Sequence, residues 1–319
     1  MGCVVKMEIY SYMLMVAMQV VILFMLIAVG FILTKAKMLG ENGAKQITNL
    51  VLYFVTPAVI LNAFVGGRVE NTPENIKKLG IAVVAAIIAH ALGFLIGILV
   101  FRGHDRESNL RICTVMSSNC GFMSLPLAQA IFGAEGVFIV TIYVGIFNIV
   151  TWTLGVRLIS GKQVSIKRAI FNPGVLSAAA GIILFLCGVN LSKIDIVMQP
   201  IQHLANLNTP LPMIVIGYYL ANTSIKLRKG DGKMLLTILL RLVVVPVVTM
   251  FVLRLIGITG TPLSGSVLPA CAPVAVAVMM FAASFDSDAE GASRAVSLSH
   301  LFSIITMPII LVLCKLIGG

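Results

Sequence analysis

The sequence predicts an all-α polytopic membrane protein, with ten transmembrane helices arranged as two inverted five-helix repeats. The first observation is composition: of 319 residues, 59% are hydrophobic and 11% charged, and the mean hydropathy is +1.05. Soluble domains hold only about 45–50% apolar residues. The second is that the apolar residues form runs of membrane-spanning length. The third is that two of these runs, at corresponding places in the two halves, are interrupted by proline and polar residues.

A helix needs about 20 apolar residues to cross a hydrocarbon core about 30 Å thick. By that measure the predicted spans are residues 12–34, 44–65, 79–101, 110–132, 137–159, 171–189, 198–221, 233–256, 264–285 and 292–317. The first run is too long for the core of a signal peptide and lacks a small-residue cleavage site, so it is retained as a span.

Lysine and arginine residues concentrate in the loops that follow odd-numbered spans. The positive-inside rule places those loops in the cytoplasm and both termini outside the cell membrane, whether plasma or inner membrane. The excess of basic residues behind the net charge of +11 is therefore explained by the orientation of the chain in a lipid bilayer. No nucleic-acid partner is expected, because no basic stripe alternates with stacking aromatic residues.

Two pairs of landmarks indicate an internal repeat. The dipeptide Thr56-Pro57 recurs as Thr209-Pro210, and the same offset carries Phe132 onto Phe285. The halves are residues 1–161 and 162–319. Because each half holds an odd number of spans, the second must enter the membrane with the opposite orientation. Coincidental placement of prolines is the alternative.

The fourth and ninth spans are the interrupted ones. Residues 117–121 and Pro126 break the fourth, and Pro269 and Pro273 break the ninth. Glycine and proline in mid-membrane free backbone groups, which is tolerated only where the break lines a cavity or is held by neighbouring protein. A proline kink satisfied by serine and threonine is the alternative. Paired broken helices at corresponding positions predict a transporter site between the repeats.

The predicted site lies where the two breaks cross. Its candidate residues are Ser118, Asn119, Cys120, Gly121, Pro126, Cys271, Ala272 and Pro273. Each second half-helix directs unpaired N–H groups and its positive dipole end toward the crossing, which favours an anion. We therefore expect a small carboxylate substrate, with Asn119 donating to it. Ser124 is expected to cap the first half-helix, and Pro273 to open the second.

Three titratable residues inside predicted spans are candidates for coupling or counter-charge. Arg241 lies well inside the eighth span, where either function or snorkelling of the side chain to the membrane surface explains it. His90 and His300 can carry a coupling proton, or simply form hydrogen bonds inside the bundle. The acidic residues near helix ends, Glu135, Asp286, Asp288 and Glu290, and Arg294 are expected to cap helices or form ion pairs.

The sequence contains no CxxC pair, no HExxH motif and no nucleotide-binding GxxxxGK[ST] motif. We therefore expect no metal, no cofactor and no coupling to ATP, so that H⁺ or Na⁺ are the candidate coupling ions. The expected class is not an enzyme. Two alternatives remain: an intramembrane enzyme using Ser117 or Ser118 with His300, and a non-transporting membrane sensor on the same fold.

Several of these segments together resemble the auxin efflux carrier family, which includes plant auxin carriers and bacterial malate and malonate permeases. They are the Thr56-Pro57 span, the run Asn119-Cys120-Gly121-Phe122 followed by Leu125-Pro126, the Phe132-Gly133 corner and the Pro273 to Phe285 segment. The resemblance covers essentially the whole chain. Ala272 stands where some plant carriers have a polar side chain, and the long central loop of many plant carriers is missing between spans five and six.

The resemblance implies the crossed-helix fold of bile-acid symporters and sodium/proton antiporters. In that fold, spans one, two, six and seven form a scaffold, through which a homodimer is expected, and the other spans form a transport domain that moves like an elevator. It also implies organic-anion substrates, such as malate or an auxin-like acid, carried by secondary transport, with Asn119 and the prolines of the two breaks at the site.

Overall fold

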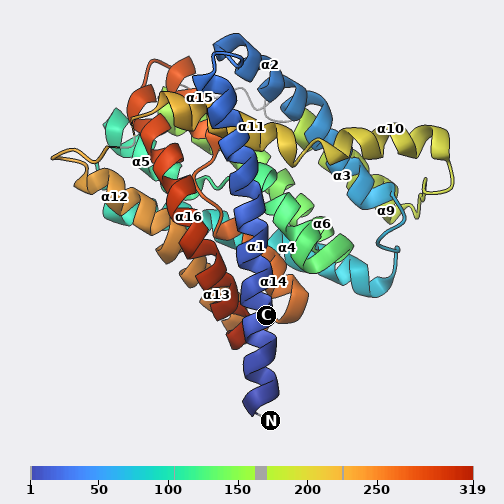
Figure 1. The fold of residues 1–319 in the computed structure, drawn as a ribbon. Helices are drawn as coiled ribbons and strands as arrows, with labels where there is room; N and C mark the ends of the chain where they lie inside the picture. Colours follow the sequence, from blue (N-terminus) through green and yellow to red (C-terminus); the bar gives the residue numbers. More distant parts are fainter. Residues whose placement is uncertain (1, 104, 162–170, 225, 319) are drawn as a thin grey trace.

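The computed structural model of the chain describes residues 2–103, 105–161, 171–224 and 226–318, which are almost entirely helical (Figure 1). Within these ranges the β structure is one isolated bridge, between Ser118 and Val274. The predicted all-α class is therefore confirmed. The predicted boundary between the halves adjoins residues 162–170, which lie outside the described ranges together with Lys162, Lys167 and Arg168.

The described part of the first half contains ten helical elements. They are α1 (Gly2–Lys35), α2 (Glu41–Leu50), η1 (Val51–Val55), α3 (Thr56–Val65), α4 (Pro73–Val100), α5 (Arg106–Met116), η2 (Cys120–Ser124), α6 (Leu125–Val150), η3 (Thr151–Gly155) and α7 (Val156–Ser160). Local sequence explains several of their starts. Thr72 accepts from Asn75 N–H and precedes Pro73 at the first turn of α4, and Asp105 caps α5 in the same way.

The described part of the second half contains nine further helical elements. They are α9 (Pro173–Leu186), α10 (Asp195–Asn206), α11 (Pro210–Asn222), α12 (Gly232–Leu239), η4 (Leu240–Val244), α13 (Val245–Leu255), α14 (Gly260–Ala270), α15 (Val276–Ser284) and α16 (Ala289–Ile317). Asn172 caps α9, and Asp288 caps α16.

Three of the π-helical turns, η1, η2 and η4, end two residues before a proline: Pro57, Pro126 and Pro246. A proline ring clashes with the carbonyl four residues earlier and offers it no N–H. Widening the preceding turn moves that carbonyl away, which is one of the local adjustments that let membrane helices hold proline.

Six helical segments of the described chain are long and apolar enough to cross a bilayer: Ile9–Lys35, Glu41–Val65, Pro73–Val100, Cys120–Ser160, Gly232–Leu255 and Ala289–Ile317. The predicted fourth and fifth spans share the run Cys120–Ser160, which bends at Gly133, where φ is 62° and ψ is −146°. The predicted sixth, seventh and ninth spans fall on shorter or interrupted helices. An integral membrane protein is supported, while ten crossings in two inverted repeats stay a prediction.

Helix packing gathers the elements into two groups, which also pack against each other, α1 against α16 and α6 against α9. Helix α1 packs along α11, and α3 packs against α9 and α10, so the helices of predicted spans one, two, six and seven contact one another extensively. Helix α6 packs against α4 and α14, α4 also against α5 and α13, and α15 against α16. Large apolar side chains on the outer face of α1, such as Met25 and Ile32, are exposed, as expected of a surface facing lipid.

Candidate functional site

The two interrupted helices meet at their breaks. Helix α5 ends at Met116 and helix α14 ends at Ala270. Between the breaks, the N–H of Asn119 donates to the carbonyl of Pro273 at 2.7 Å, and the N–H of Ala275 donates to the carbonyl of Ser117 at 3.0 Å. This antiparallel pairing satisfies backbone groups that the two broken helices leave free in a region without water. The interruptions predicted from the sequence are therefore present, and they contact each other directly.

Two predicted details of the half-helices are wrong. Ser124 makes no capping bond, and η2 instead starts after Asn119, whose carbonyl accepts from Met123 N–H. The second half-helix, α15, begins at Val276 and not at Pro273. Pro273 lies in the extended pairing because its carbonyl is the acceptor for Asn119, so it cannot open a helix.

A cavity of about 180 Å³ lies beside the first break, and we name it the break cavity. It is lined by the polar residues Asn49, Thr56, Asn119, Asn148, Thr151 and Ser284, by the aromatic residues Tyr53, Phe122, Phe147, Trp152 and Phe281, and by Leu52, Gly121, Val144, Ala275, Val276, Ala277 and Met280. The rings of Trp152 and Phe281 pack edge to face, with 5.0 Å between their centroids. No lysine, arginine or histidine is among the lining residues of this cavity in the described ranges.

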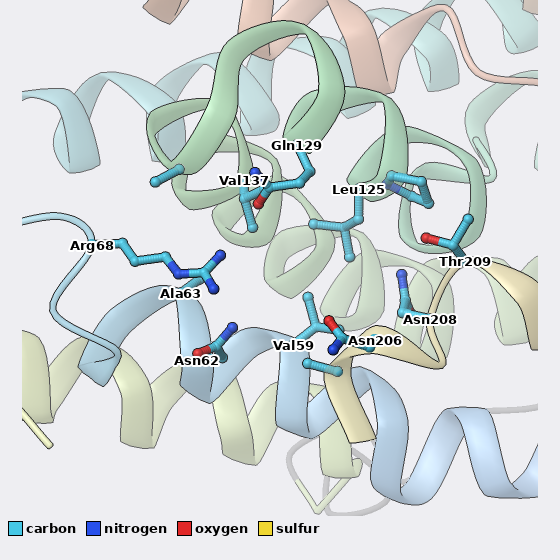
Figure 2. A pocket seen from close by; sticks show the side chains of 13 residues that line it. Val59, Asn62, Ala63, Arg68, Leu125, Gln129, Val137, Asn206, Asn208 and Thr209 are labelled. Atoms are coloured by element: carbon cyan, nitrogen blue, oxygen red, sulfur yellow. The ribbon is translucent and has the colours of Figure 1, made fainter. Parts of the chain in front are cut away.

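A second cavity of about 140 Å³ lies further along α3, toward the end where that helix stops, and we name it the Arg68 cavity (Figure 2). Arg68, Asn62, Gln129 and Asn206 present polar side chains to it, and Pro126 is in its wall. Asn208, which also lines this cavity, donates from Nδ2 to the carbonyl of Gly121 at 3.3 Å. Because Gly121 lines the break cavity, this bond stands between the two cavities.

Arg241 is held at the ends of both first half-helices. Its guanidinium donates from Nη1 to the carbonyls of Val115 at 2.9 Å and Met116 at 3.3 Å, and from Nη2 to the carbonyl of Ala270. The side chain is 1% exposed, so it does not snorkel to the membrane surface. The carbonyls at a helix C-terminus carry the negative end of its dipole. Arg241 therefore places one fixed positive charge against the negative ends of α5 and α14.

The two buried histidines have different surroundings. His300, in α16, lies with Nε2 at 2.9 Å from Asn119 Nδ2 and with Nδ1 at 2.7 Å from the carbonyl oxygen of Val296. His90, in α4, contacts the carbonyl of Ala86 through Nδ1 and stacks against Tyr143. The structure thus brings His300 to the break and to Asn119, whereas the ring of His90 lies against Tyr143 and Phe147 of α6.

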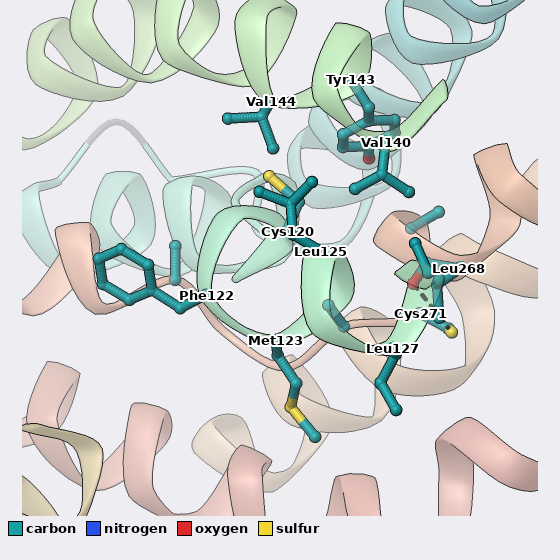
Figure 3. Close-up of a cluster of buried hydrophobic side chains, with 14 of the residues drawn as sticks. Cys120, Phe122, Met123, Leu125, Leu127, Val140, Tyr143, Val144, Leu268 and Cys271 are labelled. Carbon is teal, nitrogen blue, oxygen red and sulfur yellow. Dashed lines mark hydrogen bonds between the residues drawn. The ribbon is translucent and has the colours of Figure 1, made fainter. Parts of the chain in front are cut away.

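The predicted site residues separate into two sets. Asn119 and Gly121 line the break cavity, and Pro126 lines the Arg68 cavity. Ser118, Cys120, Cys271, Ala272 and Pro273 are enclosed by protein and support the crossing without lining either cavity. Figure 3 shows Cys120 and Cys271 among buried apolar side chains such as Leu125 and Leu268. In this conformation both thiols are shielded from solvent.

The geometry does not assemble a serine nucleophile. Both ring nitrogens of His300 are occupied by Asn119 and Val296, and no hydrogen bond joins it to Ser117 or Ser118 in the part of the chain that the structure covers. An activated serine needs an adjacent base. The same described ranges contain no group of three or more histidine, cysteine or acidic side chains able to hold a metal ion.

Four of the five charged residues predicted to cap helices or form ion pairs do so; Asp286 is exposed and forms neither within the described residues. Glu135 pairs with Lys78, Glu290 pairs with Arg228, and Asp288 accepts from the N–H of Gly291. Arg294 donates to both carboxylate oxygens of Asp231, in the loop before α12, and this lowers the pKa of that carboxyl. These groups fix the helix ends and leave none of their charge in the break cavity.

Sequence reasoning missed most of the wall opposite Asn119. Asn148 and Trp152 are four residues apart and so share one face of a helix, and Thr56 lies on η1–α3 across the cavity. The spacing of the single tryptophan of the chain and an asparagine inside one apolar run was an available signal. Their convergence with Phe281, from another element, was not readable from spacing.

Comparison with known proteins gives matches over nearly the whole chain. A family model described as a membrane transport protein matches residues 15–169 and 161–311. A protein of Methanocaldococcus jannaschii named as an uncharacterized transporter is 23% identical over 301 residues, which is 92% of this chain and 97% of that protein. Another uncharacterized transporter, from Methanothermobacter thermautotrophicus, is 26% identical over 292 residues, 89% of this chain and 93% of that protein.

Proposed function

Because this chain belongs to the membrane transport protein family, which includes the auxin efflux carriers, we propose that it is a secondary transporter of a small organic carboxylate. The observation that carries the proposal is the meeting of two broken helices beside a cavity that holds Asn119. Broken membrane helices place backbone dipoles and unpaired polar groups where a substrate crosses, so such crossings are the usual sites of secondary transporters.

The lining of the break cavity favours an acid with one carboxylate and an apolar body. Five aromatic side chains and several aliphatic ones offer a large apolar surface, whereas the polar groups are uncharged amides and hydroxyls. A second carboxylate would enter this cavity without a cationic partner, and an unpaired buried charge is costly. We therefore place aryl or branched-chain monocarboxylates before dicarboxylates such as malate.

Arg241 bears on the coupling ion. In transporters with broken helices, carbonyls at half-helix C-termini are the groups that coordinate Na⁺. Here the carbonyls of Val115, Met116 and Ala270 are taken by the Arg241 guanidinium. A fixed cation in that position supports transport without Na⁺, driven by protons or by the substrate gradient.

The proposed mechanism is alternating access of an elevator type. The two packing groups support it: α1, α3, α9, α10 and α11 would form the scaffold, and the broken helices with α4, α12, α13 and α16 would form the moving part. The break cavity and the Arg68 cavity would be the two half-pathways, separated in this conformation by the bond between Asn208 and Gly121.

The test begins with a thermal-shift panel on the purified protein, because a ligand that binds only the folded state raises the apparent melting temperature. Phenylacetate and benzoate are expected to raise it more than malate and succinate. Uptake of the best ligand into proteoliposomes, unmodified and unaffected by replacing Na⁺ with choline, then tests transport. Absence of uptake for every acid in the panel would refute the proposed function.

The first variant to test is Asn119→Ala. Loss of a hydrogen bond to a charged group costs about 1.5–3 kcal/mol, so uptake at low substrate concentration is expected to fall by about tenfold to a hundredfold. Asn222→Ala is the matched control, because Asn222 is exposed at the end of α11 and, among the described residues, bonds the carbonyl of Tyr218 alone. Equal uptake by the two variants would show that Asn119 does not bind the substrate.

A further inference from the structure

The side chain of Asn119 is held by His300, and this contact decides which end of its amide faces the break cavity. His300 Nδ1 lies 2.7 Å from the carbonyl oxygen of Val296. A carbonyl only accepts, so Nδ1 carries a hydrogen. In the neutral ring, Nε2 is then a bare acceptor, and the amide NH₂ of Asn119, at 2.9 Å, donates to it.

In this arrangement the carbonyl end of the Asn119 amide is turned away from His300. Asn119 lines the break cavity and is 4% exposed. Its Oδ1 accepts no hydrogen bond from other residues in the described ranges. An oxygen with free lone pairs at this place repels a carboxylate, so the neutral form of His300 disfavours the substrate.

Protonation of His300 reverses the contact. The imidazolium has an N–H on both nitrogens, and Nε2–H requires an acceptor. Asn119 supplies one after half a turn of its amide group, which exchanges Oδ1 and Nδ2 with almost no change in shape. The NH₂ group, with its donors, then faces the break cavity, where a carboxylate accepts from it.

We propose that His300 is a proton-dependent positioning residue: it binds one proton and, by turning the Asn119 amide, allows the break cavity to bind one carboxylate with it. This rests on the proposed function, and it names the coupling ion as H⁺. Each charge is the partner of the other, so the loaded site is neutral overall. That accounts for how a cavity without a cationic wall residue holds an anion.

The other titratable groups near α16 make no hydrogen bond to His300 within the described residues. On α16 itself they are Glu290, Arg294, Cys314 and Lys315. On the elements packed against α16 or beside the two breaks they are Tyr10, Tyr12 and Lys35 of α1, Arg106, Glu107, Arg111 and Cys113 of α5, Cys120 of η2, Tyr218 and Tyr219 of α11, Lys233 of α12, Arg241 of η4, Arg254 of α13 and Cys271 after α14. None of them hydrogen-bonds to His300 in the described residues, and Arg241 is directed to three backbone carbonyls.

The decisive measurement is proton uptake on binding. Phenylacetate is added to the purified full-length protein in weak buffer with a pH indicator. The expected result is about one proton taken up for each phenylacetate bound, and an apparent affinity that falls by about tenfold per pH unit on the alkaline side. Binding without proton uptake would overturn the proposal.

The matched variants are His300→Gln and His90→Gln. Glutamine can donate to Asn119 or accept from it but carries no charge. His300→Gln is therefore expected to bind phenylacetate more weakly than the unmodified protein, with no proton uptake and a flat pH profile. His90 is equally buried but bonds Ala86, so His90→Gln should keep the proton uptake of the unmodified protein. Uptake that persists in His300→Gln, or that disappears in His90→Gln, contradicts the assignment.

A spectroscopic readout covers the case in which His300→Gln fails to fold. Nitrogen-15 NMR of the histidine-labelled protein should show the Nδ1–H tautomer for His300 without ligand and a doubly protonated ring with phenylacetate. An Nε2–H tautomer in the ligand-free protein would refute the inference whatever the transport assays show. Conversely, proton-linked binding without uptake into proteoliposomes would refute transport and leave the role of His300 intact.

Discussion

At the residue scale, Arg241 shows how one side chain makes the crossing of two helices possible. Helices α5 and α14 both end in the protein interior, and their terminal carbonyls have no N–H partner within the helix. The guanidinium is planar and carries five donors, so a single arginine reaches carbonyls of both ends. Lysine, with one ammonium on a flexible stem, cannot bond them with the same geometry.

We predict that Arg241→Gln lowers stability substantially, because it leaves buried carbonyls of α5 and α14 without their charged donor. Hydrogen bonds to charged groups contribute about 1.5–3 kcal/mol each, so the loss should show as a clear fall in the apparent melting temperature of the purified protein. Arg254→Gln is the control: its side chain is exposed at the end of α13 and bonds one carbonyl, that of Ile317. If both variants have the same apparent melting temperature as the unmodified protein, Arg241 does not stabilise the contact between the two broken helices.

At the scale of elements, glycine determines how closely the helices of the first packing group approach. Where α1 crosses α11, a Cβ built on Gly30 would overlap the carbonyl oxygen of Ile214, and one built on Gly217 would overlap that of Ile27. The two backbones therefore touch. Small residues that permit such contact are the usual basis of helix association in membranes, where dispersion contacts replace the hydrophobic effect.

Gly30→Ala is therefore expected to destabilise the protein by about 1–3 kcal/mol, the usual cost of overpacking, because the clash is with backbone and cannot be relieved by a side-chain rotation. Gly80→Ala provides the comparison, since Gly80 also lies in a long apolar helix but has no atom within 4 Å of its added Cβ. Thermal unfolding of the two purified variants checks this. A Gly30 variant as stable as the Gly80 variant would mean that α1 and α11 separate easily.

At the scale of the whole molecule, one of the contacts between the two packing groups lies at the break itself. Asn208 lies in the bend between α10 and α11 and bonds the carbonyl of Gly121 in η2, so this contact joins the proposed scaffold to the proposed moving part. If the transport domain moves, the bond breaks during each cycle. If the carrier works without such a movement, the bond persists.

A disulfide between these positions tests the movement. In a protein otherwise free of cysteine, Gly121→Cys with Asn208→Cys is expected to support uptake when reduced and to lose it when oxidised, with recovery on addition of a thiol reductant. The added Cβ at Gly121 is 3.9 Å from the nearest side-chain atom, Val144 Cγ1, so the substitution fits. Each single variant is the control. Unchanged uptake after complete cross-linking would refute relative movement at this contact.

The breaks themselves were predictable, because Gly121, Pro126, Pro269 and Pro273 are local signals that act on their own backbone. The start of the second half-helix was not. Its first residue depends on Pro273 accepting a hydrogen bond from Asn119, more than a hundred residues earlier in the chain. The preference of proline for the first helical turn is a local rule. It takes no account of the hydrogen bond that the carbonyl of Pro273 accepts from Asn119.

The sequence by itself determined that this is a membrane protein with two interrupted helices, because composition, run length and proline position are properties of the chain that need no partner. Only the tertiary structure decided that Arg241 closes the ends of both broken helices, that Asn119 contacts His300 and that Trp152 and Phe281 enclose the same cavity. Each of these pairs joins residues far apart in the chain, and the distance between such residues is fixed by packing in three dimensions.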